Sequence, residues 1–395
     1  MLGDDFMVFS IEDVEFKDID NTFSHLNKNQ VVDIINKYYA GEPVKNIIGE
    51  YNLSVLPTRL VSIFPKILTN KKCAKCGANL VVKLKSKSYG QINFNEAYCP
   101  NCGHREDVPF CKCRYCEEER RMLEENKREY IIEALKQSRA PQKSEGELSP
   151  KDVLYMCVIL CSLLSEDASV INPLNSSVKP ITPSEKWTLE MIKYLLARDL
   201  IVVSDNSDLN AFTIPEDQNS VMYNLLEVRY DINIDPTDGD WNGMLKRLMY
   251  PDPEQFSKEF CYGMWRRIAM AESEAYLLHE MRDVRYDFNP GEKTQMVLEY
   301  LVDHFSIGQI YNIIFRAVAN STKWYSTGKV SKKRAQNSVI TKCEQFGRYA
   351  IAEKWNLKVY GRIADLPESV INEVLFNSIL KISSLGFSER PTDNF

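Results

Sequence analysis

The chain has 395 residues, of which 44% are hydrophobic and 26% are charged. This composition is too apolar for wholesale disorder, and the length predicts roughly two to three folded domains. The net charge of -6 excludes a bulk attraction for nucleic acid or anionic membrane, so any such binding must be local. The longest nearly apolar run, Val153 to Leu164, is too short to span a bilayer, and the first residues lack a signal-peptide pattern. We therefore expect a cytoplasmic protein with no membrane segment and with reduced thiols.

The first twenty residues form an acidic segment with a single base, Lys17, in which charged and apolar residues alternate. Two interpretations remain open. The segment is a strand that covers part of the core, or it is an extended arm that competes with nucleic acid for a basic surface or contacts a partner protein. Its acidic residues are Asp4, Asp5, Glu12, Asp13, Glu15, Asp18 and Asp20.

Three short helices with tight turns are predicted over residues 29–40, 44–51 and 57–64. Gly41 ends the first helix, and a proline begins the third. The layout resembles a helix-turn-helix, in which the third helix would enter a DNA groove. A plain structural bundle is the alternative. The polar face of the third helix consists of Thr58, Arg59 and Ser62.

Seven of the eleven cysteines lie between positions 73 and 116. The sequences Cys73-Ala-Lys-Cys76-Gly and Cys99-Pro-Asn-Cys102-Gly are two Cys-x-x-Cys motifs, each followed by glycine. Two intervening residues let both thiolates reach one ion, and the small residue lets backbone amides approach the sulfurs. Four thiolates suit zinc, and an iron–sulfur cluster is the chemical alternative.

The spacer between the motifs is apolar near residues 80–84 and 92–94, around Ser88-Tyr89-Gly90, which predicts a hairpin with both motifs at its open end. The whole module resembles the zinc-ribbon family. That resemblance implies a structural metal site. Zinc ribbons often belong to nucleic-acid machinery, and many serve only to stabilise the fold. A closed four-thiolate site makes a catalytic metal improbable.

A further cluster, Cys111-Lys-Cys113-Arg-Tyr-Cys116, adds three thiolates, and His104 lies close by in the sequence. Seven cysteines and one histidine supply eight ligands, the number that two tetrahedral ions need. One Zn²⁺ is therefore predicted at the first four cysteines, and a second only if His104 completes the other set. In the alternative, His104 is solvated and the last three thiols cap the first site or exchange with it.

The remainder is predicted to be mainly α-helical. A charged helix over 117–137 runs into a linker near Pro141, and the strands 200–203 and 211–214 after a helix resemble the hairpin of a winged helix. The other predicted helices are 151–165, 185–198, 254–284, 292–304, 306–326, 331–355 and 367–384. The predicted parts are 1–70 (acidic arm and helix-turn-helix-like bundle), 71–116 (small β zinc ribbon), 117–150 (charged helix and linker), 151–250 (winged-helix-like domain) and 251–395 (helical carboxyl-terminal body).

Between Arg316 and Arg362 there are eleven bases and two acids, interleaved with tryptophan and tyrosine. Phosphate contact and base stacking use this mixture. A second lysine strip lies in the ribbon. The alternative is that one strip docks against acidic parts of the same chain. The predicted nucleic-acid-binding residues are Arg59, Lys83, Lys85, Lys87, Trp324, Lys329, Lys332, Lys333, Arg334 and Arg348.

The sequence contains no phosphate-binding loop, no Rossmann glycine pattern and no His-Glu-x-x-His motif. We therefore expect a zinc-containing protein that binds nucleic acid, DNA rather than RNA, without catalysis of its own. It would regulate transcription or recognise foreign DNA in antiviral defence. The alternatives are a protein-interaction scaffold with structural zinc and an enzyme with an unfamiliar active site.

Overall fold

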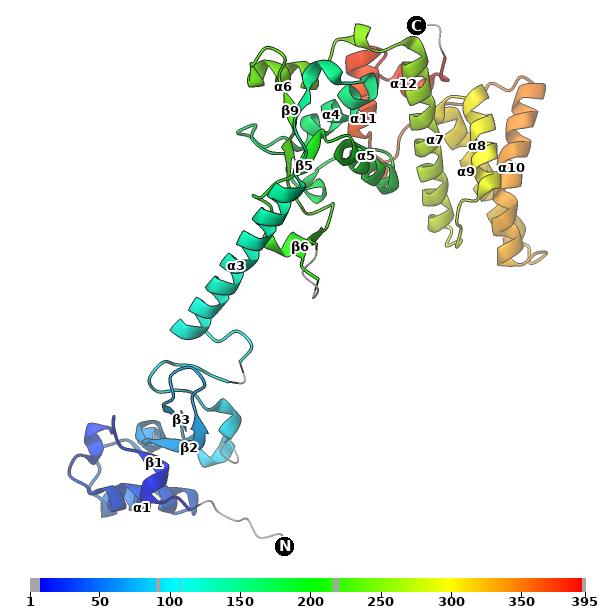
Figure 1. The fold of residues 1–395 in the computed structure, drawn as a ribbon. Helices are drawn as coiled ribbons and strands as arrows, with labels where there is room; N and C mark the ends of the chain where they lie inside the picture. The colour runs from blue at the N-terminus through cyan, green and yellow to red at the C-terminus, as the bar shows by residue number, and fades with distance from the viewer. Residues whose placement is uncertain (1–7, 90–92, 107, 216–219, 393–395) are drawn as a thin grey trace. The chain divides into compact units, whose positions relative to one another are not determined.

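The computed structural model describes residues 8–89, 93–106, 108–215 and 220–392. The chain is mainly helical with small sheets, and it divides into two compact units, Met1–Arg128 and Glu129–Phe395 (Figure 1). The predicted fold class is therefore confirmed, and the finer division into five parts stays a prediction. Among the described residues, no helix is long and apolar enough to cross a membrane.

The helices of the first unit occupy the predicted positions. They are α1 (Lys28–Tyr39), α2 (Val44–Glu50) and η3 (Pro57–Ile63). Asn27 caps α1 through a reciprocal pair of hydrogen bonds with Gln30. The third helix is a 3₁₀-helix, a form that tolerates only short runs, and Pro65 prevents its extension. A seven-residue 3₁₀-helix is a poorer reader of a major groove than the α-helix of a helix-turn-helix.

The acidic amino-terminal segment is part of the fold of this unit. It contains η1 (Ile11–Asp13), β1 (Val14–Glu15) and η2 (Asn21–Phe23). β1 pairs antiparallel with β2 (Lys66–Lys72), with Val14 opposite Ile67. The buried side chains of Phe9, Val14 and Phe23 join the helix core. The interpretation of a segment that covers part of the core is therefore correct for residues 9–23, of which only Val14–Glu15 form a strand, while Asp4 and Asp5 lie outside the described residues.

The predicted hairpin of the ribbon is wrong in its pairing. β3 (Asn79–Val82) pairs with the preceding strand β2, so the first Cys-x-x-Cys motif forms the turn between them. At the far end of the spacer, Tyr98 pairs with this sheet through an isolated bridge to Val81. The spacer folds instead into η4 (Lys87–Tyr89) and η5 (Phe94–Glu96), and Gly90 and Ile92 lie outside the described residues. The sheet order is β1-β2-β3.

The charged helix α3 (Arg114–Ser138) begins in the first unit and ends in the second. The predicted linker that follows is structured: β4 (Lys143–Ser144) pairs parallel with β9 (Ile234–Asp235), and η6 (Glu145–Glu147) leads to the next helix. Asn233 fixes the bend at Pro141, because its amide donates to the carbonyls of Pro141 and Asp199. The linker prediction therefore needs correction.

Most helices of the second unit match the predicted segments, and several of them also have a capping residue. Ser149, Ser184, Ser257, Ser306 and Ser331 each cap a helix with the side-chain oxygen. The long helices are α4 (Pro150–Leu163), α5 (Glu185–Ala197), α6 (Trp241–Met249), α7 (Lys258–Asp283), α8 (Glu292–His304), α9 (Ile307–Ser326) and α10 (Lys332–Ala352). The short ones are η7 (Leu174–Ser176), η8 (Leu209–Ala211), η9 (Pro253–Gln255), α11 (Val370–Glu373), the π-helix η10 (Val374–Ile379) and α12 (Leu385–Ser388). The helix α6 was not predicted, and the predicted helix 367–384 is only α11 and the π-helix η10.

The predicted winged-helix-like hairpin does not form. β5 (Ile201–Val203) pairs antiparallel with β8 (Tyr230–Ile232), whereas β6 (Phe212–Thr213) pairs with β7 (Met222–Tyr223). Tyr230 explains the choice, because its ring is fully buried and its hydroxyl donates to the carbonyl of Leu225. The free energy gained by burying the side chains of β8 decides the pairing of β5. The closeness in sequence of the two predicted strands does not decide it.

Candidate metal centres

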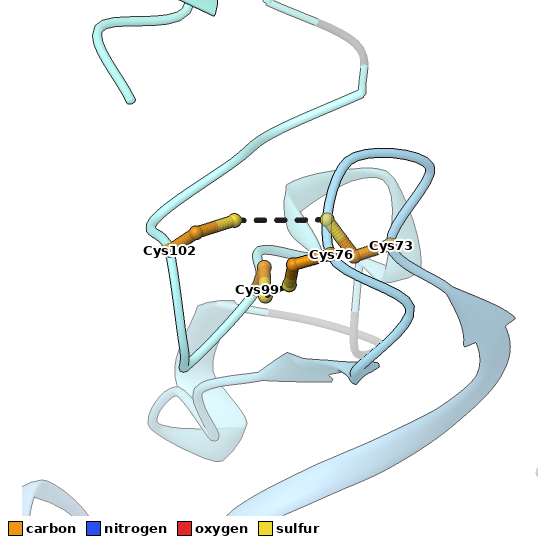
Figure 2. Close-up of side chains that lie close together, drawn as sticks. All are labelled: Cys73, Cys76, Cys99 and Cys102. Atoms are coloured by element: carbon orange, nitrogen blue, oxygen red, sulfur yellow. Dashed lines mark hydrogen bonds between the residues drawn. The ribbon is translucent and has the colours of Figure 1, made fainter. Parts of the chain in front are cut away.

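The first cysteine set converges at the turn of the β2–β3 hairpin. Cys73 and Cys76 come from this turn, and Cys99 and Cys102 from the loop after Tyr98 (Figure 2). All four sulfur atoms lie within 4.8 Å of one another. Cys73 Sγ is 3.7 Å from Cys102 Sγ, and Cys76 Sγ is 3.3 Å from Cys99 Sγ. The predicted four-thiolate site is therefore assembled.

The two Cys-x-x-Cys motifs adopt the same backbone conformation. The amide of Cys73 donates to the carbonyl of Ala78 at 2.7 Å, and the amide of Cys99 donates to that of His104 at 2.8 Å. Gly77 and Gly103 have φ values of +73° and +74°, in the left-handed region that favours glycine. This turn is the physical reason for the glycine after each motif.

The donor geometry fits zinc. A Zn–S bond is about 2.3 Å, so two sulfurs at tetrahedral corners lie about 3.8 Å apart. The separations of 3.3 and 3.7 Å are close to this value, and no carboxylate joins the set among the described residues. The arrangement is closed by four protein ligands and therefore suits a structural rather than a catalytic ion.

A second set of four ligands lies next along the chain and consists of His104, Cys111, Cys113 and Cys116. The Nδ1 atom of His104 is 3.7 Å from Cys113 Sγ and 3.3 Å from Cys116 Sγ. Nitrogen and sulfur on one tetrahedral zinc would be about 3.6 Å apart. His104 is buried, which overturns the alternative in which its ring is solvated. Both clusters are consistent with binding of Zn²⁺, and the eight predicted side chains lie in two sets of four.

His104 belongs to both centres. Its carbonyl accepts the hydrogen bond from Cys99 of the first set, while its imidazole faces Cys113 and Cys116 of the second. The second centre is also held to α3, because Arg120 donates to the carbonyl of Cys111 at 2.9 Å. The fold of the first turn therefore places a ligand of the second site.

Several thiols of the two clusters have shifted pKa values, because neighbouring sulfurs and backbone amides lie at short range. The backbone amide of Ala78 and the Cys99 thiol lower the pKa of Cys76 to about 6. Burial and the neighbouring thiolate of Cys113 raise the pKa of Cys116 to about 11. In the second set, burial of Cys111 is outweighed by hydrogen bonds from the backbone amides of Arg105 and Cys113, which lower the pKa of Cys111 to about 6. One sulfur of each set is thus prepared as a thiolate, and a dication would displace the remaining protons.

All of the predicted carboxyl-terminal contacts except Arg348 lie at the end of the helical hairpin where α9 connects to α10 (Figure 1). We call five exposed bases there the basic tip. The ring of Trp324 is half-buried, with the Arg334 guanidinium 5.6 Å and the Lys342 ammonium 5.2 Å from its centre. A nucleobase could stack on the Trp324 ring only if it displaced one of these two side chains. The basic tip comprises Lys323, Lys329, Lys332, Lys333 and Arg334.

The other predicted contacts are more varied. Arg348 lies away from the basic tip, where it pairs with Glu344 at 2.9 Å. In the first unit, Arg59 is exposed on η3. Lys85 pairs with Glu96 at 2.5 Å, and the Lys87 ammonium lies 5.2 Å from the ring centre of Tyr38.

A groove of about 670 Å³ in the first unit was not predicted from the sequence. Its walls combine acids of the amino-terminal segment, Asp18 and Asp20, with Lys66 of β2 and Lys83 just after β3. The only sequence signal was the acidic run itself, because the facing lysines lie more than forty residues away in the chain.

The geometry defines a class of protein, in which a small module with two Cys/His metal sites is joined to a helical body. No family model matches the chain, and no curated protein or solved structure matches it.

Proposed function

We propose that the chain is a zinc-containing nucleic-acid-binding protein that acts by binding, without turnover. The basic tip of α9 and α10 is its main contact with the phosphate backbone. The binding would serve regulation of transcription or recognition of foreign DNA in antiviral defence. Metal ligands must be reduced thiols, which supports a cytoplasmic location.

One observation carries the proposal. All five bases of the basic tip are exposed, and in the part of the chain that the structure describes, none forms an ion pair with a carboxylate. Five basic side chains without carboxylate partners repel one another at this density, and contact with phosphates would relieve that repulsion. Internal docking of the tip on acidic residues gains no support from these contacts.

The position of the bases along α10 adds to the argument. Ser331 caps this helix and accepts a hydrogen bond from the amide of Arg334 at 3.3 Å. Lys332, Lys333 and Arg334 therefore occupy the first turn, where the helix dipole disfavours positive charge. Helix stability gives no reason for bases at these positions, whereas contact with an anion does.

In the first unit, Lys71 and Lys72 at the end of β2 and Lys83 just after β3 are exposed near the first metal centre. The two zinc ions would hold this small module in shape, because its own buried core is small. We propose that these lysines supply a second, weaker contact. Duplex DNA is the preferred ligand, since most of the basic side chains are arranged for phosphate contact. The Trp324 ring already contacts Arg334 and Lys342, so it is not free to stack on a nucleobase of a single strand.

The test uses the zinc-loaded full chain and a fluorescent random-sequence duplex across a salt series. Replacing Lys332, Lys333 and Arg334 together by glutamate removes three phosphate contacts and should lower the slope of log affinity against log salt by about 2.7. Binding at about 0.1 M salt should weaken by more than about 100-fold on every sequence tested.

The matched control places the same change of charge elsewhere on the second unit. Lys186, Lys193 and Lys246 are exposed on α5 and α6, and their replacement by glutamate should leave the salt slope unchanged. If the tip variant binds as tightly as the parent at low salt, the tip is not a nucleic-acid contact. An interaction scaffold then becomes the better description.

A further inference from the structure

An exposed apolar turn leads into the second metal centre. The amide of Cys111 donates to the carbonyl of Val108 at 3.2 Å, which closes a β-turn with Pro109 and Phe110 at its two central positions. Phe110 is 77% exposed, Val108 is 41% exposed, and Pro109 is exposed between them. Single apolar residues are common on a protein surface, but three in succession around a large ring indicate a contact with another molecule.

The metal centre holds this turn in one conformation. The side chain of Cys111 belongs to the second ligand set, and its carbonyl accepts a hydrogen bond from Arg120 of α3 at 2.9 Å. Its sulfur also accepts one from the amide of Arg105 at 3.4 Å. Pro109 fixes the backbone at the second position of the turn. The Phe110 ring is therefore pre-organised, and little conformational entropy is lost when it binds.

Two basic residues follow the ring. Cys111 and Cys113 are buried in the metal centre, whereas Phe110, Lys112 and Arg114 are exposed. This alternation places Phe110 and Lys112 on the outer side of the segment. The backbone between them spans at most about 7 Å, so a ligand on the ring lies within reach of the long Lys112 side chain.

The charges around the turn favour an anionic ligand on one side of the ring. Arg114 is the first residue of α3, and among the described residues neither Lys112 nor Arg114 forms an ion pair with a carboxylate. The acids Glu106 and Asp107 precede the turn, and Asp107 lies outside the described residues. An exposed aromatic ring followed by two cations is the combination that contacts a nucleobase and its phosphates.

We propose that Phe110 stacks on an unpaired nucleobase of DNA while Lys112 and Arg114 bind the neighbouring phosphates of that strand. Nucleobases inside a duplex are covered on both faces by their neighbours. A base that is already unpaired is the least costly to bring onto a protein ring. The inference rests on the proposed function and deepens it, because it names the feature of the nucleic acid that the zinc module recognises.

Two fluorescent duplexes of one sequence test this inference, one of them with an extra unpaired adenine. The zinc-loaded full chain should bind the bulged duplex at least about fivefold more tightly, and Phe110→Ala should bind both equally. Phe110→Trp keeps an aromatic ring and should keep the preference, whereas Phe110→Leu is apolar without a ring and should lose it. Tyr250→Ala, which removes a ring that is 75% exposed in the second unit, is the control and should behave like the parent.

A third duplex carries an abasic site at the bulge and separates stacking from bending of the DNA. The parent should bind it no more tightly than the fully paired duplex. If the abasic bulge is preferred as strongly as the adenine bulge, the DNA backbone and not the nucleobase is recognised, and the inference falls. It also falls if the parent binds the paired and bulged duplexes equally, or if Phe110→Ala or Phe110→Leu keeps the preference.

The salt-slope test of the basic tip reports on a different contact. A parent without bulge preference whose binding still depends on the basic tip refutes only the role of Phe110. A bulge preference that depends on Phe110, in a chain whose tip variant binds like the parent, supports Phe110 and refutes the tip. A parent that binds none of the duplexes refutes both.

Discussion

Replacing His104 by alanine should separate the two metal centres. The substitution removes the imidazole whose Nδ1 faces Cys113 and Cys116, but it keeps the carbonyl that accepts the hydrogen bond from Cys99. We therefore expect the variant to lose the second zinc ion and to keep the first. The parent should contain two equivalents of zinc and little iron, because the two sets offer four ligands each.

The size of the effect follows from the ligand count. Structural zinc sites bind with about 10 to 16 kcal/mol, or about 2.5 to 4 kcal/mol for each of four ligands. Loss of one ligand should then weaken the second site by about 60- to 700-fold. Dialysis against a chelator of intermediate affinity, followed by elemental analysis, should leave two equivalents in the parent and one in His104→Ala.

The control is His25→Ala, because His25 is an exposed histidine of the same unit that belongs to neither set. It should retain two equivalents. The reasoning is refuted if His104→Ala also retains two, since the imidazole would then not be a ligand. Loss of both ions would refute the separation of the centres, because the backbone of His104 would not suffice to hold the first turn.

Two further predictions concern stability. Cys76→Ser should lose the first zinc ion and unfold the ribbon while the helices of the second unit persist. The reason is that the metal supplies much of the folding free energy of so small a core. Limited proteolysis with mass spectrometry should find cleavage confined to the first unit, and cleavage throughout the second unit would contradict this. Burial raises the pKa of Glu272 despite its hydrogen bond from Arg362 at 2.7 Å, so the folded protein binds this proton at a higher pH than the unfolded chain does. The free energy of unfolding contributed by Glu272 therefore rises as the pH falls through the folded pKa and levels off below the unfolded value of about 4.5, with a slope of at most about 1.4 kcal/mol per pH unit. Glu272→Gln should abolish this slope in urea unfolding measured over a pH series, and a variant with the slope of the parent would exclude Glu272 as its source.

Much of this fold follows from local sequence. Helices are specified by nearby residues, chiefly an apolar periodicity and in α9 also a serine cap, and so α8 and α9 fall within a residue of the predicted ends. The metal ligands are similarly local, because the Cys-x-x-Cys spacing and the following glycine prescribe one particular turn. Even His104 could be proposed as a ligand from the sequence, because seven cysteines need one more ligand to complete two tetrahedral sites. The sequence did not show whether its ring is buried or solvated.

Tertiary structure alone decided the strand pairings, because strands are stabilised by partners that can be distant in sequence. β5 pairs with β8 and not with β6, which is closer in sequence. β3 pairs with the preceding strand β2 and not with the later part of the spacer. The burial of His104 against Cys113 and Cys116 is also a tertiary fact. So is the exposure of the basic tip, since the sequence shows where charges lie along the chain, whereas packing determines which of them find a partner.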